Sequence, residues 1–390
     1  MKIYHQHGHN FVWNLDSYAE DDCGDGHILS PVNIESEKIT KRMSEDIRKS
    51  SFFDPQFYLP NDAAKKLQTY TFFPKNVLST FSTSDFIEQA YDIAQRCLVF
   101  QNELNFQYSV IPTRYFSELP ENALEQLTAT FLEPFISEHS RIQDAPPLLL
   151  TVIVKPIQLE NELLRSELIS WITNYPELKG VYLIFDNDFY SKQIKDSEYL
   201  SNQLLFIHYL RQNGLEVHVG YTNTEGYLLS IADPTSVPVG SYENLRSFGT
   251  QRLETREPGT QQGPTPRIYS SKLFQWIPNT YLPPMRRLIS DWESLFDDSP
   301  YSEYLLDPSS RLNFNRKEIY KHYFFIFSRQ AEELPVDLQK RTSFIVEKVK
   351  IAIENFERIS NHNVFLDSNS DGSHLPAWMN AISIYNSEIV

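Results

Sequence analysis

The sequence has little cysteine and no long apolar run. Cys23 and Cys97 are its two cysteines, too few for a disulfide framework or for a four-cysteine zinc site. A membrane helix needs about 18 consecutive apolar residues, and no stretch approaches that length. The N-terminal segment MKIYHQHGHN lacks the basic start and the apolar run of a signal peptide. We therefore expect a cytoplasmic protein with free thiols and no membrane partner.

Sharp functional motifs are also missing. The sequence contains neither the glycine pattern of dinucleotide-binding folds, nor a phosphate-binding P-loop, nor the nucleophile elbow of serine hydrolases. No motif therefore indicates a cofactor. The formal net charge is −16, which opposes nonspecific coating of a polynucleotide. Function has to be sought in single residues that the fold brings together.

The chain does contain short apolar runs, which stretches of helical periodicity separate. Residues 148–155, 181–186 and 216–221 are the clearest runs, and the two segments between them have the pattern of amphipathic helices. Such a rhythm is typical of parallel strands joined by helical crossovers. We predict strands at residues 26–31, 52–58, 106–111, 148–155, 181–186, 216–221, 236–242 and 267–273.

Eight parallel strands are the number that closes a barrel, whereas a doubly wound open sheet usually has about five to seven. We therefore predict an α/β fold of the (β/α)8 TIM-barrel type with a C-terminal helical extension. The alternative is an open sheet, in which the first or the eighth run would form a loop or a hairpin.

The pattern becomes entirely helical after residue 273, with predicted helices at 283–296, 316–333 and 336–359. We expect two parts: a barrel over residues 1–282, and a helical extension over 283–390 that packs on it. The segment 250–266 is rich in glycine and proline and should form a long loop before the last strand, in the position of a lid.

Catalytic groups in this fold lie at the carboxyl ends of the strands, where the βα loops converge. Asp54 lies within a run of large apolar and aromatic residues, where a carboxylate has to be paired or catalytic. Lys155 could act as a Schiff-base amine or a general base, or could simply extend to the rim. Asp186 and Glu243 could flank a glycosidic bond, although acidic residues after strands also form turns and helix starts. We predict these four as catalytic candidates.

The segment 246–287 holds seven basic residues and two acidic ones in a strongly acidic chain. Loops after the seventh and eighth strands of such barrels often bind phosphate, and arginine offers two parallel hydrogen bonds for it. The alternative is a solvated basic patch that pairs with acidic surface or with a partner chain. Among the residues near strand ends, which also include Glu225, we predict that eight bind substrate: Gln56, Arg114, Asn187, Tyr221, Asn223, Asn244, Arg246 and Lys272.

The N-terminal sequence HQHGH places His5, His7 and His9 at alternating positions, a spacing that suits a metal. Later strand ends do not supply the further ligands that a barrel metal centre needs: the run at 181–186 ends in Asp186, and the run at 267–273 offers serine. We therefore predict no metal site. The simpler interpretation is a polar N-terminal strand that closes the bottom or side of the barrel.

Two functions follow from this pattern. The first is a hydrolase or transferase with glycosyl- or phosphate-type chemistry, acting at the barrel mouth on a phosphorylated or nucleotide-like small molecule or on a local nucleic-acid segment. The second is a non-catalytic barrel that serves as an interaction component of a multi-protein system. In that case the helical extension, with its aromatic run HYFFIF at 322–327, would bind the partner protein.

Overall fold

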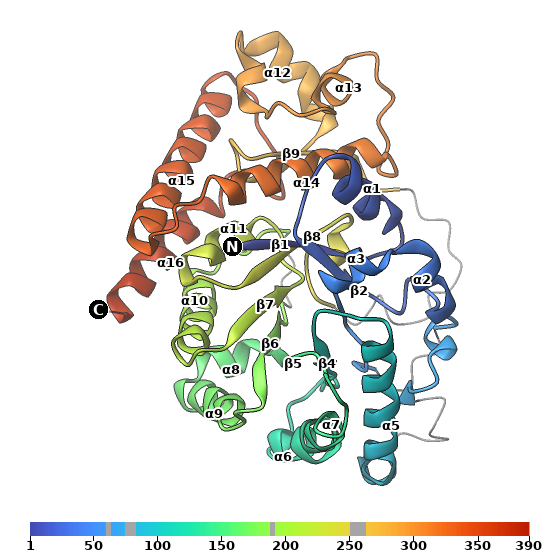
Figure 1. Ribbon diagram of the computed structural model, residues 1–390. Helices are drawn as coiled ribbons and strands as arrows, with labels where there is room; N and C mark the ends of the chain where they lie inside the picture. The colour runs from blue at the N-terminus through green and yellow to red at the C-terminus, as the bar shows by residue number, and fades with distance from the viewer. Residues whose placement is uncertain (60–63, 75–82, 188–191, 250–262, 390) are drawn as a thin grey trace.

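Parallel strands and helices alternate from the N-terminus to Gly240 in the computed structural model, which describes all residues except 60–63, 75–82, 188–191, 250–262 and 390. One sheet contains eight parallel strands in the order β3-β2-β1-β8-β7-β6-β5-β4. An isolated parallel bridge links Phe52 of β3 with Tyr108, the residue before β4, so the sheet nearly closes into a barrel (Figure 1). The predicted (β/α)8 barrel is confirmed. Its strands are β1 (Lys2–Gln6), β2 (Gly26–Leu29), β3 (Phe52–Phe53), β4 (Ser109–Ile111), β5 (Leu148–Val154), β6 (Leu178–Phe185), β7 (Glu216–Gly220) and β8 (Ser236–Gly240).

Two of the predicted strand assignments are wrong. The first barrel strand is β1, which pairs with β2 on one side and β8 on the other, so the run at 26–31 is the second strand. The run at 267–273 is not a barrel strand. It contains β9 (Arg267–Ser270), which pairs antiparallel with β10 (Gln275–Pro278) in a separate two-stranded sheet. The sheet still closes, because β1 takes the place that the eighth run was expected to fill.

Helices follow the strands as the barrel requires. Their starts are capped in the usual way: the Asn161 side chain accepts from two backbone amides of α9, and Asp196 caps α10 by accepting from Tyr199. The helical elements up to β9 are α1 (Val12–Glu20), η1 (Ser36–Lys38), α2 (Ile39–Arg42), α3 (Glu45–Lys49), η2 (Leu67–Thr69), α5 (Thr83–Glu103), α6 (Ala123–Leu127), the π-helix η3 (Thr128–Leu132), α7 (Glu133–His139), α8 (Pro156–Glu160), α9 (Glu162–Thr173), α10 (Ser197–Gln212), α11 (Glu225–Leu229), η4 (Ser230–Ala232) and η5 (Glu243–Leu245).

One helix of the C-terminal part covers barrel strands directly. Helix α14 packs on β1 and β8 beside α1, and its Lys321 pairs with Glu20 and Asp21 at the end of α1 at 2.7 and 3.2 Å (Figure 1). The division at residue 282 stays a prediction. The predicted helix at 283–296 is shorter than expected, and a last helix, α16, was not predicted. These elements are η7 (Asn279–Tyr281), α12 (Leu282–Leu288), η8 (Trp292–Leu295), α13 (Ser302–Leu306), α14 (Lys317–Glu332), α15 (Leu338–Asn361) and α16 (Leu375–Glu388).

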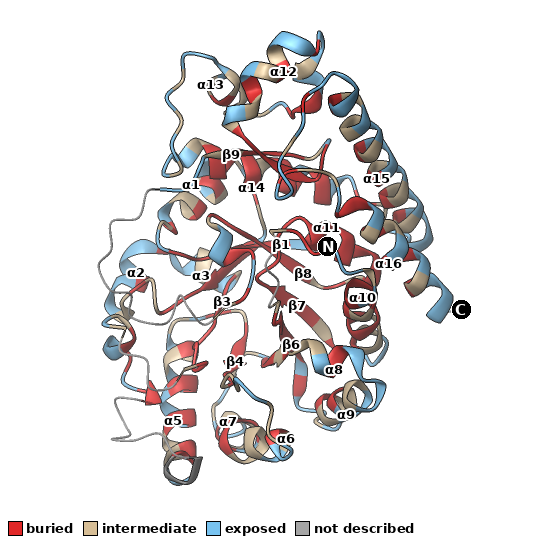
Figure 2. Cartoon of the chain, turned by 180° about the vertical axis from the view of Figure 1, so that it is seen from behind, coloured by how far each residue is buried: buried red, intermediate tan, exposed pale blue. Residues whose placement is uncertain are grey.

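Aromatic side chains fill the barrel interior. The Phe52 ring lies 5.3–5.5 Å, centroid to centroid, from the rings of Tyr4, Tyr182 and His218. Gly220 makes room for this packing, since a Cβ there would lie 2.6 Å from the Tyr182 hydroxyl. Buried residues follow the strands and the inner faces of the helices (Figure 2). No helix in the described part of the chain is long and apolar enough to cross a membrane.

Candidate functional site

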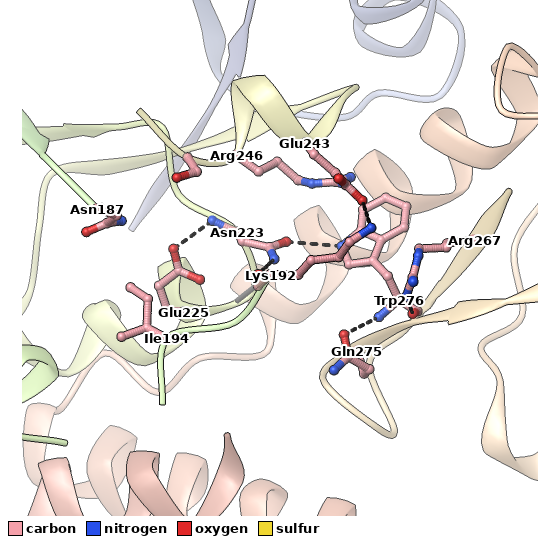
Figure 3. Close-up of a pocket in the computed structure, with 11 residues that line it drawn as sticks. Asn187, Lys192, Ile194, Asn223, Glu225, Glu243, Arg246, Arg267, Gln275 and Trp276 are labelled. Carbon is pink, nitrogen blue, oxygen red and sulfur yellow. Dashed lines mark hydrogen bonds and ion pairs between the residues drawn. The ribbon is translucent and has the colours of Figure 1, made fainter. Parts of the chain in front are cut away.

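A pocket of about 310 Å³ lies at the carboxyl ends of β6, β7 and β8, against the β9–β10 hairpin (Figure 3). The loops after β7 and β8 contribute most of its polar side chains, and the hairpin forms its outer wall. We refer to it as the acid pocket. Its lining residues are Asn187, Lys192, Ile194, Asn223, Glu225, Glu243, Arg246, Ser247, Arg267, Gln275 and Trp276.

Glu225 is the buried acid of this pocket. It begins α11, four residues after Tyr221, and is 3% exposed. Its Oε1 accepts a 2.9 Å hydrogen bond from the Asn223 amide, whereas its buried Oε2 has no hydrogen-bond partner among the described residues. Burial raises the pKa of Glu225 to about 7, against a smaller opposing effect of the Asn223 hydrogen bond. A carboxyl group with that pKa can both donate and accept a proton near neutral pH.

Glu243 is the second acid, and its environment acts in the other direction. Its side chain is 53% exposed, and its Oε1 accepts a 2.5 Å hydrogen bond from Lys192 Nζ. Partial burial alone would raise the pKa of Glu243, but the hydrogen bond and charge of Lys192, with the charge of Arg246, lower it overall. Two carboxylates whose pKa values move apart are suited to different roles, one as the acid and one as the ionised group.

Arg246 places a buried positive charge beside these acids. It is 5% exposed, and its guanidinium carbon lies 3.8 Å from the centre of the Trp276 ring. One nitrogen donates to the Ser241 carbonyl oxygen at 3.3 Å, but Nε is buried without a hydrogen-bond partner in the described part of the structure. Within the described ranges no carboxylate forms an ion pair with Arg246. A buried cation without a carboxylate partner is suited to bind an anion.

Hydrogen bonds hold the pocket wall in place. Trp276 Nε1 donates to Asn223 Oδ1 at 3.1 Å, and Asn223 Nδ2 donates to the Lys192 carbonyl oxygen at 2.9 Å. Arg267 donates to the Trp276 carbonyl oxygen and to Ser370 Oγ. The β7 loop, the hairpin and the segment before α16 are thus tied together around the site.

The predicted residues at the centre of the barrel mouth form a separate group, which we call the Asp54 network. Asp54 accepts a hydrogen bond from the backbone N–H of Gln56 at 3.0 Å, and from the hydroxyls of Tyr58 and Tyr221 at 2.7 and 3.4 Å. The Phe248 ring covers it, with centroids 5.3 and 5.6 Å from the two tyrosines. Gln56 and Tyr221 have φ of 55° and 56°, a strained left-handed conformation for residues other than glycine. None of these side chains lines the acid pocket.

Lys155 and Asp186 form a third group, at the ends of β5 and β6. Lys155 Nζ lies 3.5 Å from the Asp186 carboxylate, donates to the Ser117 carbonyl oxygen at 2.9 Å, and sits 4.6 Å above the Tyr115 ring. Arg114 lies nearby and lines, with Lys155, a small cavity of about 30 Å³. Lys155 and Asp186 therefore form an ion pair outside the acid pocket, and their predicted catalytic role stays a prediction.

The strand-end rule thus locates part of the pocket. Four predicted residues line it: the acid Glu243, the cation Arg246, and the amides Asn187 and Asn223. Asn244 lines an adjoining cavity, and Lys272 lies apart, 3.9 Å from Asp297. The sequence places Glu225 at the rim but gives no sign of its burial. Lys192 and Trp276 lie within the predicted βα loops but were not among the predicted residues, because the rule selects residues close to the strand ends. The predicted lid at 250–266 falls largely outside the described residues.

The N-terminal histidines lie on the outer face of the barrel. His5 of β1 stacks on His27 of β2, and His7 meets the His27 ring edge-on; all three, which we call the histidine stack, are buried, whereas His9 is exposed. His7 Nε2 lies 3.0 Å from His27 Nδ1, and His5 Nε2 lies 2.8 Å from the Cys23 carbonyl oxygen. Burial lowers the pKa of His5 to about 4 and that of His7 to about 3. In the described ranges no group of three or more His, Cys, Asp or Glu residues could hold a metal ion.

Fold and site together define a (β/α)8-barrel protein with a polar pocket at the carboxyl ends of β6, β7 and β8. No family model, curated protein or solved structure matches the chain.

Proposed function

We propose that the acid pocket binds a phosphorylated small molecule and catalyses hydrolysis or transfer of a glycosyl group. The observation that carries this proposal is the pair of carboxylates with opposite pKa shifts, Glu225 and Glu243, which line one pocket with a buried arginine. In glycosyl chemistry one carboxyl group protonates the leaving group, and an ionised carboxylate activates water or attacks the sugar carbon. Glu225 fits the first role and Glu243 the second.

The charge of the pocket supports an anionic substrate. Lys192, Arg246 and Arg267 line it, against one ionised carboxylate, Glu243, and a Glu225 that is half protonated near pH 7. The pocket is therefore positive within an acidic chain. Arg246 lines the pocket and forms no ion pair among the described residues, so a phosphate bound there would give its buried charge an ionic partner.

The test is turnover of phosphorylated sugars and nucleoside phosphates by the purified protein, followed by mass spectrometry of the products. Glu225→Gln should lower kcat about 10²- to 10⁴-fold while KM changes little, because the amide keeps the size of the side chain but cannot donate an acidic proton. Glu243→Gln should lower kcat to a similar extent. Glu198→Gln is the matched control, since Glu198 is exposed in the first turn of α10 and outside the pocket.

Equal turnover by Glu225→Gln and the unsubstituted protein would contradict the catalytic role. Binding of phosphorylated compounds without turnover by any of them would favour the alternative, a barrel that serves as an interaction component. Loss of affinity in Arg246→Ala would still assign the anion site in that case.

A further inference from the structure

A second cavity, of about 330 Å³, adjoins the acid pocket. The two share four lining residues: Glu243, Arg246, Arg267 and Trp276. We call the second one the aromatic cavity. Its other lining residues are Tyr242, Asn244, Pro264, Thr265, Pro266, Phe314, Ile319 and Tyr320.

The aromatic cavity differs from the acid pocket in its chemistry. The Tyr242 and Tyr320 rings lie 5.1 Å apart at 63°, and Trp13 stacks behind Tyr320 at 5.4 Å and 13°. Tyr320 is further fixed by its hydroxyl, which donates to the Phe314 carbonyl oxygen at 2.6 Å. Rings held in this way are fixed in position, and aromatic side chains can stack on any nucleobase.

The shared wall joins the two chemistries. The Arg246 guanidinium carbon lies 3.8 Å from the centre of the Trp276 ring, and both residues line both cavities. An anionic group on one side of Arg246 can therefore belong to the same molecule as a planar group on the other. Each cavity lies near the lower end of the range for small-molecule sites, about 300–1,000 Å³. A ligand in two parts can therefore occupy both.

We propose that the acid pocket and the aromatic cavity together bind a mononucleotide, with its phosphate against Arg246 and its base among the rings of the aromatic cavity. This inference rests on the proposed function for the anion site and names the substrate class. A mononucleotide fits better than a polynucleotide. The net charge of −16 repels a chain of phosphates strongly, but it repels a single phosphate beside a local cation only weakly.

The experiment is isothermal titration with the four common ribonucleoside 5′-monophosphates and with ribose 5-phosphate, which lacks the base. At least one nucleotide should bind about tenfold more tightly than ribose 5-phosphate. Phe314→Ala, at a half-buried position, should reduce that advantage to about threefold or less and leave ribose 5-phosphate binding unchanged. Phe365→Ala is the control, since Phe365 is 70% exposed and lines neither cavity.

Arg246→Ala separates the two proposals. If it weakens the binding of ribose 5-phosphate and of the nucleotides alike, and the nucleotide advantage is present, the anion site and the nucleotide inference both hold, and turnover tests the catalytic role separately. If ribose 5-phosphate binds as tightly as every nucleotide and Arg246→Ala weakens all of them, the anion site holds and the nucleotide inference is overturned. Binding that Arg246→Ala does not change, or no nucleotide binding up to about 1 mM, overturns the inference. Tighter binding of a single-stranded oligonucleotide than of any mononucleotide also overturns it.

Discussion

Two polar regions lie at the carboxyl ends of the strands, and they differ in whether their hydrogen bonds are complete. In the Asp54 network both carboxylate oxygens accept hydrogen bonds, and Phe248 covers the group. In the acid pocket one oxygen of Glu225 and one nitrogen of Arg246 have no partner in the described part of the chain, and both residues line a cavity. Both regions bury polar groups. Of the two, the acid pocket is the one that combines unpaired polar atoms with a cavity that a ligand can enter.

The largest expected difference between the two regions is in the pH dependence of turnover. Glu225 has to be protonated to act as the acid, so kcat/KM should fall about tenfold per pH unit as the pH rises above about 7. Glu225→Gln should be slow and should lack this decline. Asp54→Asn should retain it, because Asp54 does not line the pocket. The measurement is kcat/KM from about pH 6 to 9. If the decline disappears in Asp54→Asn, the titrating acid belongs to the Asp54 network and not to the acid pocket.

The second difference is in stability. Asp54→Ala removes the acceptor of the Gln56 amide and the Tyr58 hydroxyl in a buried place, so the free energy of unfolding should fall by about 3 kcal/mol or more. Urea denaturation measures it. The affinity of the folded variant for ribose 5-phosphate should stay within about twofold of the original. Loss of that affinity in a folded variant would place Asp54 in the binding site.

A third prediction concerns the stability cost of Glu225. Its pKa is raised in the folded state, so the stability that it contributes is complete below about pH 4.5 and is lost as the pH rises through about 7. Glu225→Gln cannot ionise and should remove this loss, which makes the variant more stable than the original protein at pH 8 by roughly 3 kcal/mol. Urea denaturation at about pH 5 and 8 checks it, and equal pH dependence in both proteins would contradict it.

The smallest expected effect comes from the histidine stack, which has buried atoms without partners but lines none of the described pockets. His5 and His7 have lowered pKa values in the folded state, so the stability that they contribute is present above about pH 6.5 and is lost as the pH falls toward about 4. Each should account for about 2 kcal/mol between pH 7 and 5. His5→Asn should make this acid-side loss shallower without changing phosphate affinity. A change in affinity would connect the stack to the site.

Much of the barrel could be predicted because β5 and residues 181–185 of β6 are continuous apolar runs. The runs of β5, β6 and β7 are unambiguous, since both faces of a parallel strand are buried. β1 could not be recognised, because its outward face carries His5, which is polar in sequence but buried between the barrel and α14. The run at 267–273 has the same alternation in a hairpin as in a barrel strand, and its pairing partner decides between them.

The site could be predicted only where the strand ends supply it. Asn223, Glu243 and Arg246 follow strands directly, and the rule for this fold locates them. Sequence pattern gives no measure of how deeply Glu225 is buried, and that burial produces its raised pKa. Trp276 belongs to the hairpin, whose contact with the β7 loop depends on tertiary packing alone.

The hairpin also makes the last part of the chain responsible for the pocket. Arg267 and Gln275 of the hairpin bond to Ser370 and to the Asp371 carbonyl oxygen, and His374 bonds to the Phe274 carbonyl oxygen. A chain that stopped after α15 would keep every barrel strand and both acids, yet the outer wall would lose its support from behind. Residues 370–374 thus hold the hairpin in position from outside the pocket. A barrel shortened before them would keep both acids but not the enclosed space between these acids and the hairpin.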